Sequence, residues 1–290
     1  MKIIRSCHQI QSLCIALKKK GKSIGFVPTM GFLHEGHLSL FRKARQENDI
    51  LIVSIFVNPT QFGPREDFRK YPRDLNRDKT LCSREKVDIL FVPSSVAVYP
   101  SGYQTFVDPG LLGAPLCGKS RPGHFRGVAT VVTKLFDLVR PTVAYFGQKD
   151  YQQALIIQQL VRDLNMPVKV KILPTRHDRD GLAMSSRNTY LDDEARRKAL
   201  SIPKTLKWSC DQIRKGVRNI PFLKQGMRKI LSRELSRIDY IEIVEARNLS
   251  PAKKLSGKIL IALAGVVWTV KKGKKMKVRL IDNCLLDIAN

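Results

Sequence analysis

In the stretch SIGFVPTMGFLHEGH, residues 23–37, an apolar run leads directly into a polar loop that contains two glycines after the run and two histidines. Residues 24–27 predict a short buried strand, and residues 36–47 predict a helix because their apolar side chains recur at roughly helical spacing. Glycines in the loop between them let the backbone approach a ligand closely. The start of the helix offers unpaired N–H groups to an anion. This strand–loop–helix unit therefore predicts a binding site for a charged ligand.

Strand-like and helix-like segments alternate along the chain after this unit. Residues 49–57 are apolar nearly throughout, as expected for a strand of a parallel sheet that is covered on both faces. Further strands are predicted at 88–92, 143–146 and 168–173, and helices through the seventies and eighties, at 127–139 and at 150–164. The alternation predicts an α/β fold with a Rossmann-like, doubly wound parallel sheet.

The pattern changes after Pro174. Residues 191–236 are mostly helical in pattern and basic. Three strand-like segments follow, at 239–245, 258–264 and 277–282. Strands with such short connections predict a small antiparallel sheet accompanied by helices. We therefore expect two domains, a Rossmann-like domain over residues 1–175 and a smaller C-terminal α+β domain over residues 176–290.

The composition is that of an ordinary globular protein, with 43% hydrophobic and 27% charged residues. The N-terminal segment has polar residues within its apolar pattern and no small-residue cleavage site, so we expect a short helix and loop rather than a signal peptide. The apolar run 259–270 is too short to cross a bilayer. Six cysteines without a Cys-x-x-Cys pair argue against a zinc ribbon and against a disulfide framework. These features predict a cytoplasmic protein with no membrane partner.

The formal net charge of +27 is high for a chain of 290 residues. Such a charge raises the question of nucleic-acid binding. The basic residues are spread over the whole chain and are not interleaved with aromatic residues, which favours solvated surface charge instead. We therefore expect no specific nucleic-acid partner.

Four islands of polar and glycine residues fall at the ends of predicted strands or at the domain junction: 28–37, 58–63, 147–153 and 180–188. In an open α/β sheet, ligands bind beyond the carboxyl ends of the strands. The second island offers neutral amides to a small polar substrate. The third adds an ammonium and a carboxylate, and the fourth adds hydroxyls and a guanidinium that suit a polyphosphate. Together the islands predict one positively charged pocket.

His34 and His37 stand three residues apart, so both can face the same way at the start of the predicted helix. Imidazoles in that position are suited to bind phosphate oxygens and to supply positive charge or a proton as charge develops. Two alternatives remain open. The pair could belong to a zinc site, although the spacing is three rather than four and no further ligand follows. The histidines could also do no more than cap the helix.

The islands and their surroundings resemble the signatures of the pantothenate synthetase family. This family belongs to a nucleotidyltransferase superfamily that shares a His-x-x-His (HIGH-type) signature with class I aminoacyl-tRNA synthetases. The resemblance covers nearly the whole chain, and its blocks occur in the family's order: 28–37, 55–62 with 66–73, 121–128, 146–150, 181–188 and 279–283.

The resemblance implies an ATP-dependent ligase that condenses (R)-pantoate with β-alanine. The products would be pantothenate, AMP and pyrophosphate, formed through a pantoyl-adenylate. Mg²⁺ would accompany the ATP, and the protein would be a homodimer. The first domain would hold the nucleotide and pantoate, and the second would act as a lid.

The resemblance also assigns roles to individual residues. His37 would be the proton donor, assisted by His34 and Lys149, and Gln61, Gln153 and Asn58 would hold pantoate and β-alanine. The residues that would contact ATP are Met30, Gly31, Phe32, Leu33, His34, Glu35, Gly36, His37, Gly147, Gln148, Lys149, Asp150, Arg176, Met184, Ser185, Ser186 and Arg187.

The chain departs from the family pattern at a few positions. Arg176 stands where small apolar residues contact the nucleotide, and Cys117 stands where an acid is common. Two other functions remain as alternatives. Another small-molecule nucleotidyltransferase would release pyrophosphate but leave the nucleotide on its product. An RNA-binding module related to the tRNA synthetases would fit the charge, but the chain has no Lys-Met-Ser-Lys-Ser loop.

Overall fold

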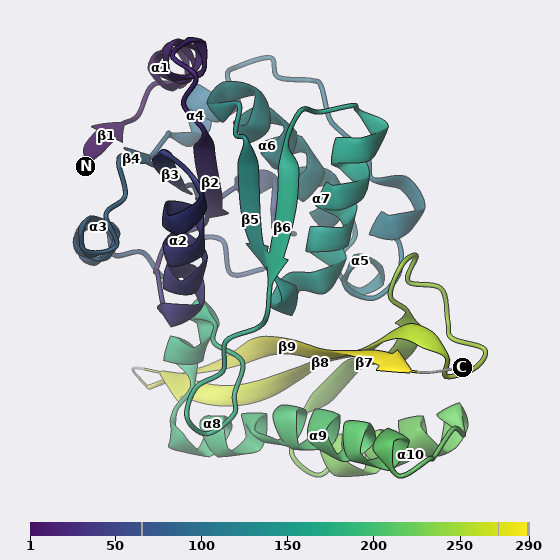
Figure 1. The fold of residues 1–290 in the computed structure, drawn as a ribbon. Helices are drawn as coiled ribbons and strands as arrows, with labels where there is room; N and C mark the ends of the chain where they lie inside the picture. Colours follow the sequence, from purple (N-terminus) through teal and green to yellow (C-terminus); the bar gives the residue numbers. More distant parts are fainter. Residues whose placement is uncertain (65, 272, 289–290) are drawn as a thin grey trace. The chain divides into compact units, whose positions relative to one another are not determined.

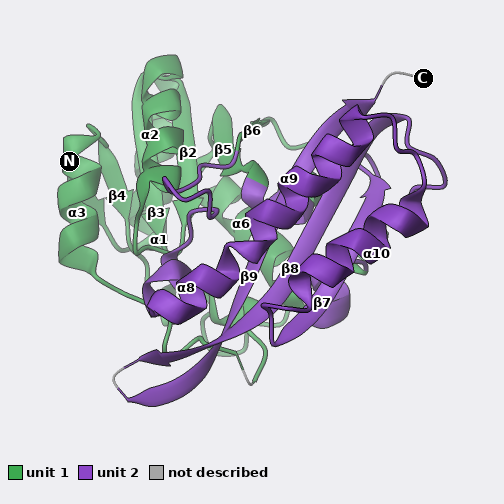
Figure 2. Cartoon of the chain, turned by 90° about the horizontal axis from the view of Figure 1, so that it is seen from below, with its two compact units in different colours: residues 1–114, 121–148, 153–174 green, residues 115–120, 149–152, 175–290 purple. Residues whose placement is uncertain are grey.

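A computed structural model describes residues 1–64, 66–271 and 273–288. The chain forms two compact units, coloured green and purple in Figure 2. The first consists of residues 1–114, 121–148 and 153–174. The second consists of residues 115–120, 149–152 and 175–290. Two short segments before residue 175 thus belong to the second unit, and the roles assigned to the two predicted domains stay predictions.

The first unit contains a six-stranded parallel sheet in the order β1-β4-β3-β2-β5-β6 (Figure 1). Its strands are β1 Lys2–Ile4, β2 Ile24–Thr29, β3 Ile50–Ile55, β4 Ile89–Phe91, β5 Val143–Gly147 and β6 Lys169–Leu173. The chain leaves β2 towards β3 on one side, and the later strand β5 pairs with β2 on the other. The direction of winding therefore reverses between β2 and β5. In such sheets the carboxyl ends of the strands at the reversal point form the usual ligand site.

Helices cover both faces of this sheet, which explains its apolar strands. The helices are α1 Cys7–Lys19, α2 Glu35–Glu47, α3 Leu75–Arg84, α4 Ser95–Val98, α6 His124–Val139 and α7 Tyr151–Asp163, with 3₁₀ turns η1 Pro59–Gln61, η2 Gly110–Gly113 and η3 Gln148–Asp150. Val27 of β2 packs in one cluster with Phe41 of α2. Its neighbour Phe26 points the opposite way and meets Phe136 of α6 edge-on, with ring centroids 6.5 Å apart. The two helices thus lie on opposite faces, as Figure 1 shows.

The second unit contains an antiparallel sheet in the order β7-β8-β9. Its elements are α5 Cys117–Ser120, η4 Ser186–Tyr190, α8 Asp193–Ala199, α9 Ser201–Arg214, α10 Ile220–Leu231, β7 Arg237–Glu245, β8 Gly257–Lys271 and β9 Lys274–Ile288. Helices α9 and α10 lie along one face of the sheet (Figure 1). Their buried residues, among them Leu206 and Met227, form one core with Ile241 and Ile261 of the strands.

The fold class predicted from the sequence is confirmed, with three local differences. The N-terminus adds a strand, β1, that pairs with β4 at the sheet edge. Three residues carry too little pattern to reveal a strand, which explains why it was missed. Helix α6 begins at His124, three residues earlier than predicted. Strands β8 and β9 are much longer than predicted and pair over their whole length. Within the described ranges, no helix is long and apolar enough to span a membrane.

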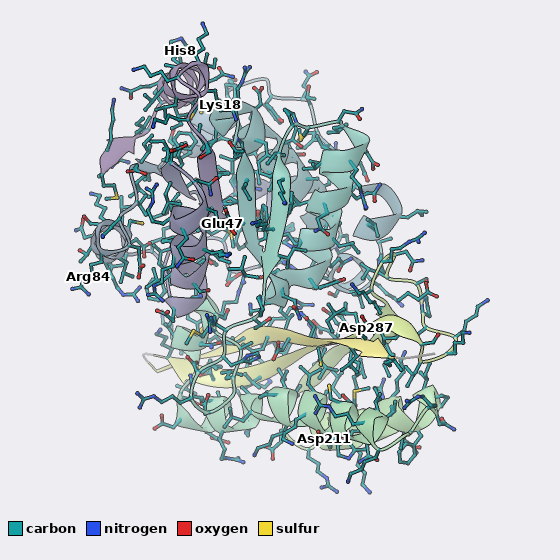
Figure 3. The ribbon with its side chains drawn as sticks, in the orientation of Figure 1. His8, Lys18, Glu47, Arg84, Asp211 and Asp287 are labelled. Carbon is teal, nitrogen blue, oxygen red and sulfur yellow. The ribbon has the colours of Figure 1, made fainter. Side chains whose placement is uncertain are left out.

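The C-terminal end of α2 is tied to the sheet by Glu47, which is labelled in Figure 3. Its carboxylate accepts hydrogen bonds from Lys171 Nζ of β6 and Tyr145 Oη of β5, both at 2.7 Å. Lys43 Nζ lies 3.0 Å away on the same helix. These hydrogen bonds lower the pKa of Glu47 to about 2, and the one from Lys171 has the largest effect. One carboxylate therefore connects three elements of the first unit.

We expect Glu47 to make the free energy of unfolding depend on pH. Because its folded-state pKa lies below the usual value of 4.5, its contribution is complete above that value and is lost as the pH falls towards 2. Urea unfolding of Glu47→Gln should show a loss of stability at pH 7 that shrinks by pH 3. Asp287→Asn, at an exposed carboxylate of β9, is the control and should differ little from wild type at either pH. An equal deficit for Glu47→Gln at both pH values would contradict this role.

Candidate functional site

The loop after β2 is held in place by a buried carboxylate on α3. Asp78 is 1% exposed, and its two oxygens accept the backbone N–H groups of Phe32 and Leu33, each at 2.8 Å. Burial raises the pKa of Asp78, and these two hydrogen bonds act against that rise. Gly31 has φ +81°, and a Cβ there would lie 2.9 Å from the Ile55 side chain. The loop thus needs both a glycine and Asp78, and the sequence pattern did not single out Asp78.

Two histidines stand where this loop enters α2. His34 is the N-cap residue, and its backbone N–H donates to Nδ1 of His37 at 3.3 Å. Their ring centroids lie 4.0 Å apart. Because Nδ1 of His37 accepts this hydrogen bond, the neutral ring carries its proton on Nε2. His37 can therefore donate a hydrogen bond from Nε2. The capping alternative is thus partly right, since the histidines do organise the helix start.

The Asp78 carboxylate should be essential for this loop. We expect Asp78→Asn to lower the free energy of unfolding by roughly 2–3 kcal/mol, because an amide N–H₂ would then face a buried backbone N–H. Urea unfolding measures the loss. Asp74→Asn is a matched control on the same helix, since Asp74 is the N-cap residue of α3 and Asn caps equally well. Equal stabilities for the two variants would contradict the role of Asp78.

The second predicted island folds into a network of buried amides after β3. Asn58 Nδ2 donates to Gln61 Oε1 and to the carbonyl of Gly127, both at 3.1 Å. Asn58 Oδ1 accepts from Tyr99 Oη at 2.8 Å. Gln61 Nε2 reaches the first loop and lies 3.3 Å from Met30 Sδ. The structure therefore brings the predicted pantoate-binding Gln61 into contact with the predicted ATP-binding Met30.

An arginine and a histidine that the sequence analysis left without a role fix the backbone of Gln61. Arg121 forms a two-point ion pair with Glu66, at 2.7 and 2.6 Å. Arg121 Nη2 also donates to the Gln61 carbonyl at 3.2 Å, and His124 Nδ1 lies 2.8 Å from the same oxygen. Both residues fall within the block 121–128, but the sequence does not reveal that their side chains reach the distant Gln61 carbonyl. They position Gln61 rather than offer a separate site.

Helix α6 packs against this loop at Gly127 without room for a side chain. A Cβ at position 127 would lie 2.4 Å from the Thr60 carbonyl oxygen and 2.7 Å from the Gln61 nitrogen. Both are backbone atoms, so neither can move aside without shifting the loop. Glycine is required here by the close approach of a helix to the loop.

Gly127→Ala should therefore disturb the Gln61 loop. We expect the free energy of unfolding to fall by about 1–3 kcal/mol, whereas Ala would raise it by about 1 kcal/mol in an unhindered helix. Gly63→Ala is the control, because a Cβ there would lie 3.7 Å from its nearest neighbour, an ordinary contact. Denaturant unfolding distinguishes the two, and a Gly127→Ala protein as stable as wild type would refute the close contact.

The predicted residues of the fourth island lie in the second unit, as does Arg176, which precedes the island. Arg176 and Met184 face each other across a turn, where the Met184 N–H donates to the Arg176 carbonyl at 2.9 Å. His177 Nε2 lies 3.1 Å from Oδ2 of the buried Asp282, whose hydrogen bond raises the pKa of the histidine. The Ser185 hydroxyl accepts the N–H of Arg187 and so caps the 3₁₀ turn η4. The island is thus an ordered loop attached to β9.

The third island is divided between the units. Gly147, Gln148 and Gln153 belong to the first unit, and Lys149 and Asp150 belong to the second. The carbonyl of Lys149 accepts a hydrogen bond from Asn283 Nδ2 of β9 at 2.9 Å. In the first unit, the structure brings Gln61 into contact with Met30 and Asn58, and brings His34 into contact with His37. That Lys149 and Arg187 face the same pocket as the histidines stays a prediction.

Comparison with known proteins shows which family the chain belongs to. The family model for pantoate-β-alanine ligase matches residues 2–285. The chain belongs to this family. The family predicted from the sequence blocks is thereby confirmed.

Ligases of this family resemble the chain over nearly its full length. The pantothenate synthetase of Thermosipho melanesiensis is 52% identical over 286 residues, which are 99% of each chain. That of Moorella thermoacetica is 50% identical over 289 residues, again 99% of each. The crystal structure of pantothenate synthetase from Thermus thermophilus is 41% identical and has a TM-score of 0.89, with complete coverage of both chains.

A further solved structure of the family carries ligands. It is the pantoate-β-alanine ligase of Francisella tularensis, described as complexed with β-γ ATP and β-alanine. It is 38% identical to the chain and covers 98% of it, with 97% of its own length and a TM-score of 0.78.

Proposed function

We propose that the protein condenses (R)-pantoate with β-alanine at the expense of ATP. In the first step the pantoate carboxylate attacks the α-phosphorus of ATP, which gives a pantoyl-adenylate and releases pyrophosphate. In the second step the amine of β-alanine attacks the activated carbonyl, which gives pantothenate and releases AMP. Family membership over the whole chain supports this proposal, as does a relative described as complexed with β-γ ATP and β-alanine.

The contact between Gln61 and Met30 carries the proposal. Gln61 is assigned to pantoate and Met30 to ATP, and their side chains meet at 3.3 Å. Substrates held by these two residues would therefore be neighbours, which the first step requires. Holding two reactants in line can replace much of the entropy cost of their encounter.

The first step brings one anion to another, so the site must supply positive charge and hydrogen-bond donors. His37 is assigned to this task because its ring, with the proton on Nε2, can donate to a phosphoryl oxygen as charge develops. The N-terminus of α2 adds the positive end of the helix dipole. Lys149 and Arg187 are proposed to neutralise the triphosphate and the departing pyrophosphate.

The second step depends chiefly on orientation, since an amine attacks an acyl-adenylate without further activation of the carbonyl. Gln61, Asn58 and Gln153 are proposed to hold the substrates through neutral amides, which do not compete for their charges. An acyl-adenylate hydrolyses readily, so we also propose that the second unit excludes water as a lid. Mg²⁺ would enter with ATP as part of the substrate. The homodimer and the cytoplasmic location stay predictions.

A product assay tests the proposed reaction. Purified protein mixed with ATP, Mg²⁺, pantoate and β-alanine should yield pantothenate, AMP and pyrophosphate in equal amounts, measured by mass spectrometry. Without β-alanine, exchange of labelled pyrophosphate into ATP should still occur and should require pantoate. Pyrophosphate release without AMP would favour another nucleotidyltransferase. ATP turnover that is indifferent to pantoate would rule the proposal out.

Substitutions at single residues can distinguish a loss of catalysis from a loss of folding. His37→Ala and Lys149→Ala should each slow pantoate-dependent exchange at least about 100-fold, the scale expected for a lost acid or charge-stabilising group. His8→Ala and Lys19→Ala, at exposed positions of α1, are matched controls and should retain full exchange. Figure 3 labels His8 on that helix. Near-normal rates for both site variants, with unchanged melting temperatures, would contradict the assigned roles.

A further inference from the structure

Two cysteines outside the candidate site lie in contact within the second unit. Cys210 is on α9 and Cys284 is on β9, and their sulfur atoms are 2.9 Å apart. Within the described residues, all six cysteines are free thiols. The two side chains come from segments 74 residues apart in sequence, so only the tertiary structure pairs them.

The surroundings of this pair differ for the two thiols. Cys210 is 5% exposed and belongs to the core between α9 and the sheet. Cys284 is only partly buried and pairs with Ile261 of β8 in the antiparallel ladder. A small oxidant can therefore reach the pair from the Cys284 side, while the backbone on both sides stays fixed by regular secondary structure.

The contact also shifts the pKa values of the two thiols in opposite directions. The hydrogen bond with Cys284 lowers the pKa of Cys210, against the effect of burial and with the help of the Arg214 charge. The same hydrogen bond raises the pKa of Cys284. Cys210 thus loses its proton first, and thiolates are the reactive form of cysteine.

We propose that Cys210 and Cys284 form an oxidisable dithiol that hydroperoxides convert to an intramolecular disulfide. Hydrogen peroxide is the simplest oxidant of this class. The Cys210 thiolate attacks one peroxide oxygen and the O–O bond breaks. The departing hydroxide takes up the proton that the thiol released, so a sulfenic acid and one water result. The Cys284 sulfur then attacks the sulfenic sulfur, the S–O bond breaks, and a second water leaves. Two thiols lose two electrons and two protons in total, and the peroxide is reduced to two waters.

The geometry favours this bridge over further oxidation of a single thiol. A disulfide has an S–S bond of about 2.05 Å, so sulfur atoms at 2.9 Å need to move by less than about 1 Å. A sulfenic acid formed on Cys210 has the second thiol beside it, whereas a solitary cysteine would have none.

The bridge would fasten α9 to the strand that organises the loops of the second unit. Cys284 follows directly on Asp282, which binds His177, and Asn283, which binds the Lys149 carbonyl. A cross-link between residues 74 positions apart also removes much conformational freedom from the unfolded chain. Oxidation should therefore stabilise the second unit.

Peptide mapping after mild oxidation tests the proposal. Native protein is treated with a small excess of hydrogen peroxide, free thiols are alkylated, and the digest is examined by mass spectrometry. We expect a cross-linked peptide pair containing Cys210 and Cys284, absent after dithiothreitol. The melting temperature should rise by about 5 °C or more on oxidation and return on reduction. Neither readout depends on the proposed reaction.

Controls separate this pair from general thiol oxidation. Cys284→Ala should lose both the cross-link and the thermal shift, whereas Cys7→Ala, which removes a partly exposed thiol of the first unit, should keep both. The wild-type digest alone suffices if Cys284→Ala folds poorly. Recovery of Cys210 and Cys284 as alkylated thiols or as separate sulfinic acids would overturn the proposal. So would an equal yield of the cross-link from protein oxidised in concentrated urea.

Discussion

The predicted nucleotide loop depends on one buried carboxylate. Asp78 reaches from α3 and accepts the N–H groups of Phe32 and Leu33, at the point where the chain has left strand β2 and not yet entered α2. Unpaired, such buried groups would each cost about 1–3 kcal/mol. The same loop turns through positive φ at Gly31 and at Phe32, a conformation that is unfavourable for Phe. The hydrogen bonds to Asp78 offset that cost and hold the histidines that follow in a defined place.

The second loop is held by a different means, namely close packing reinforced by charge. Gly127 lets helix α6 approach the backbone of Thr60 and Gln61, and Asn58 donates to the Gly127 carbonyl. Arg121 and His124 then bind the carbonyl of Gln61 from the same helix region. Gly127, Arg121 and His124 act on backbone atoms of the loop, and Asn58 adds a hydrogen bond from one of its side chains. The side-chain amide of Gln61 is then placed to contact both Asn58 and Met30.

The second unit follows the same principle with a strand in the central role. Strand β9 presents Asp282 to His177 and Asn283 to the Lys149 carbonyl, while Cys284 meets Cys210 of α9. Neighbouring residues of a strand point to opposite faces, so Asp282 and Cys284 lie on one face of β9 and Asn283 lies on the other. A long strand paired along its whole length with β8 gives these contacts a rigid base. Polar loops are thus fastened to regular structure in both units.

The α/β class, the change of pattern after Pro174, the position of the polar islands and the family could all be predicted from the sequence, because periodicity and local motifs depend on neighbouring residues. It did not reveal β1, whose three residues form a strand only because β4 lies beside them. Nor did it reveal Asp78, Arg121, His124 or the thiol pair, whose partners are 45 to 74 residues away. Those contacts become apparent in the folded chain alone, because hydrogen bonds and packing between distant segments leave no periodic pattern in the sequence.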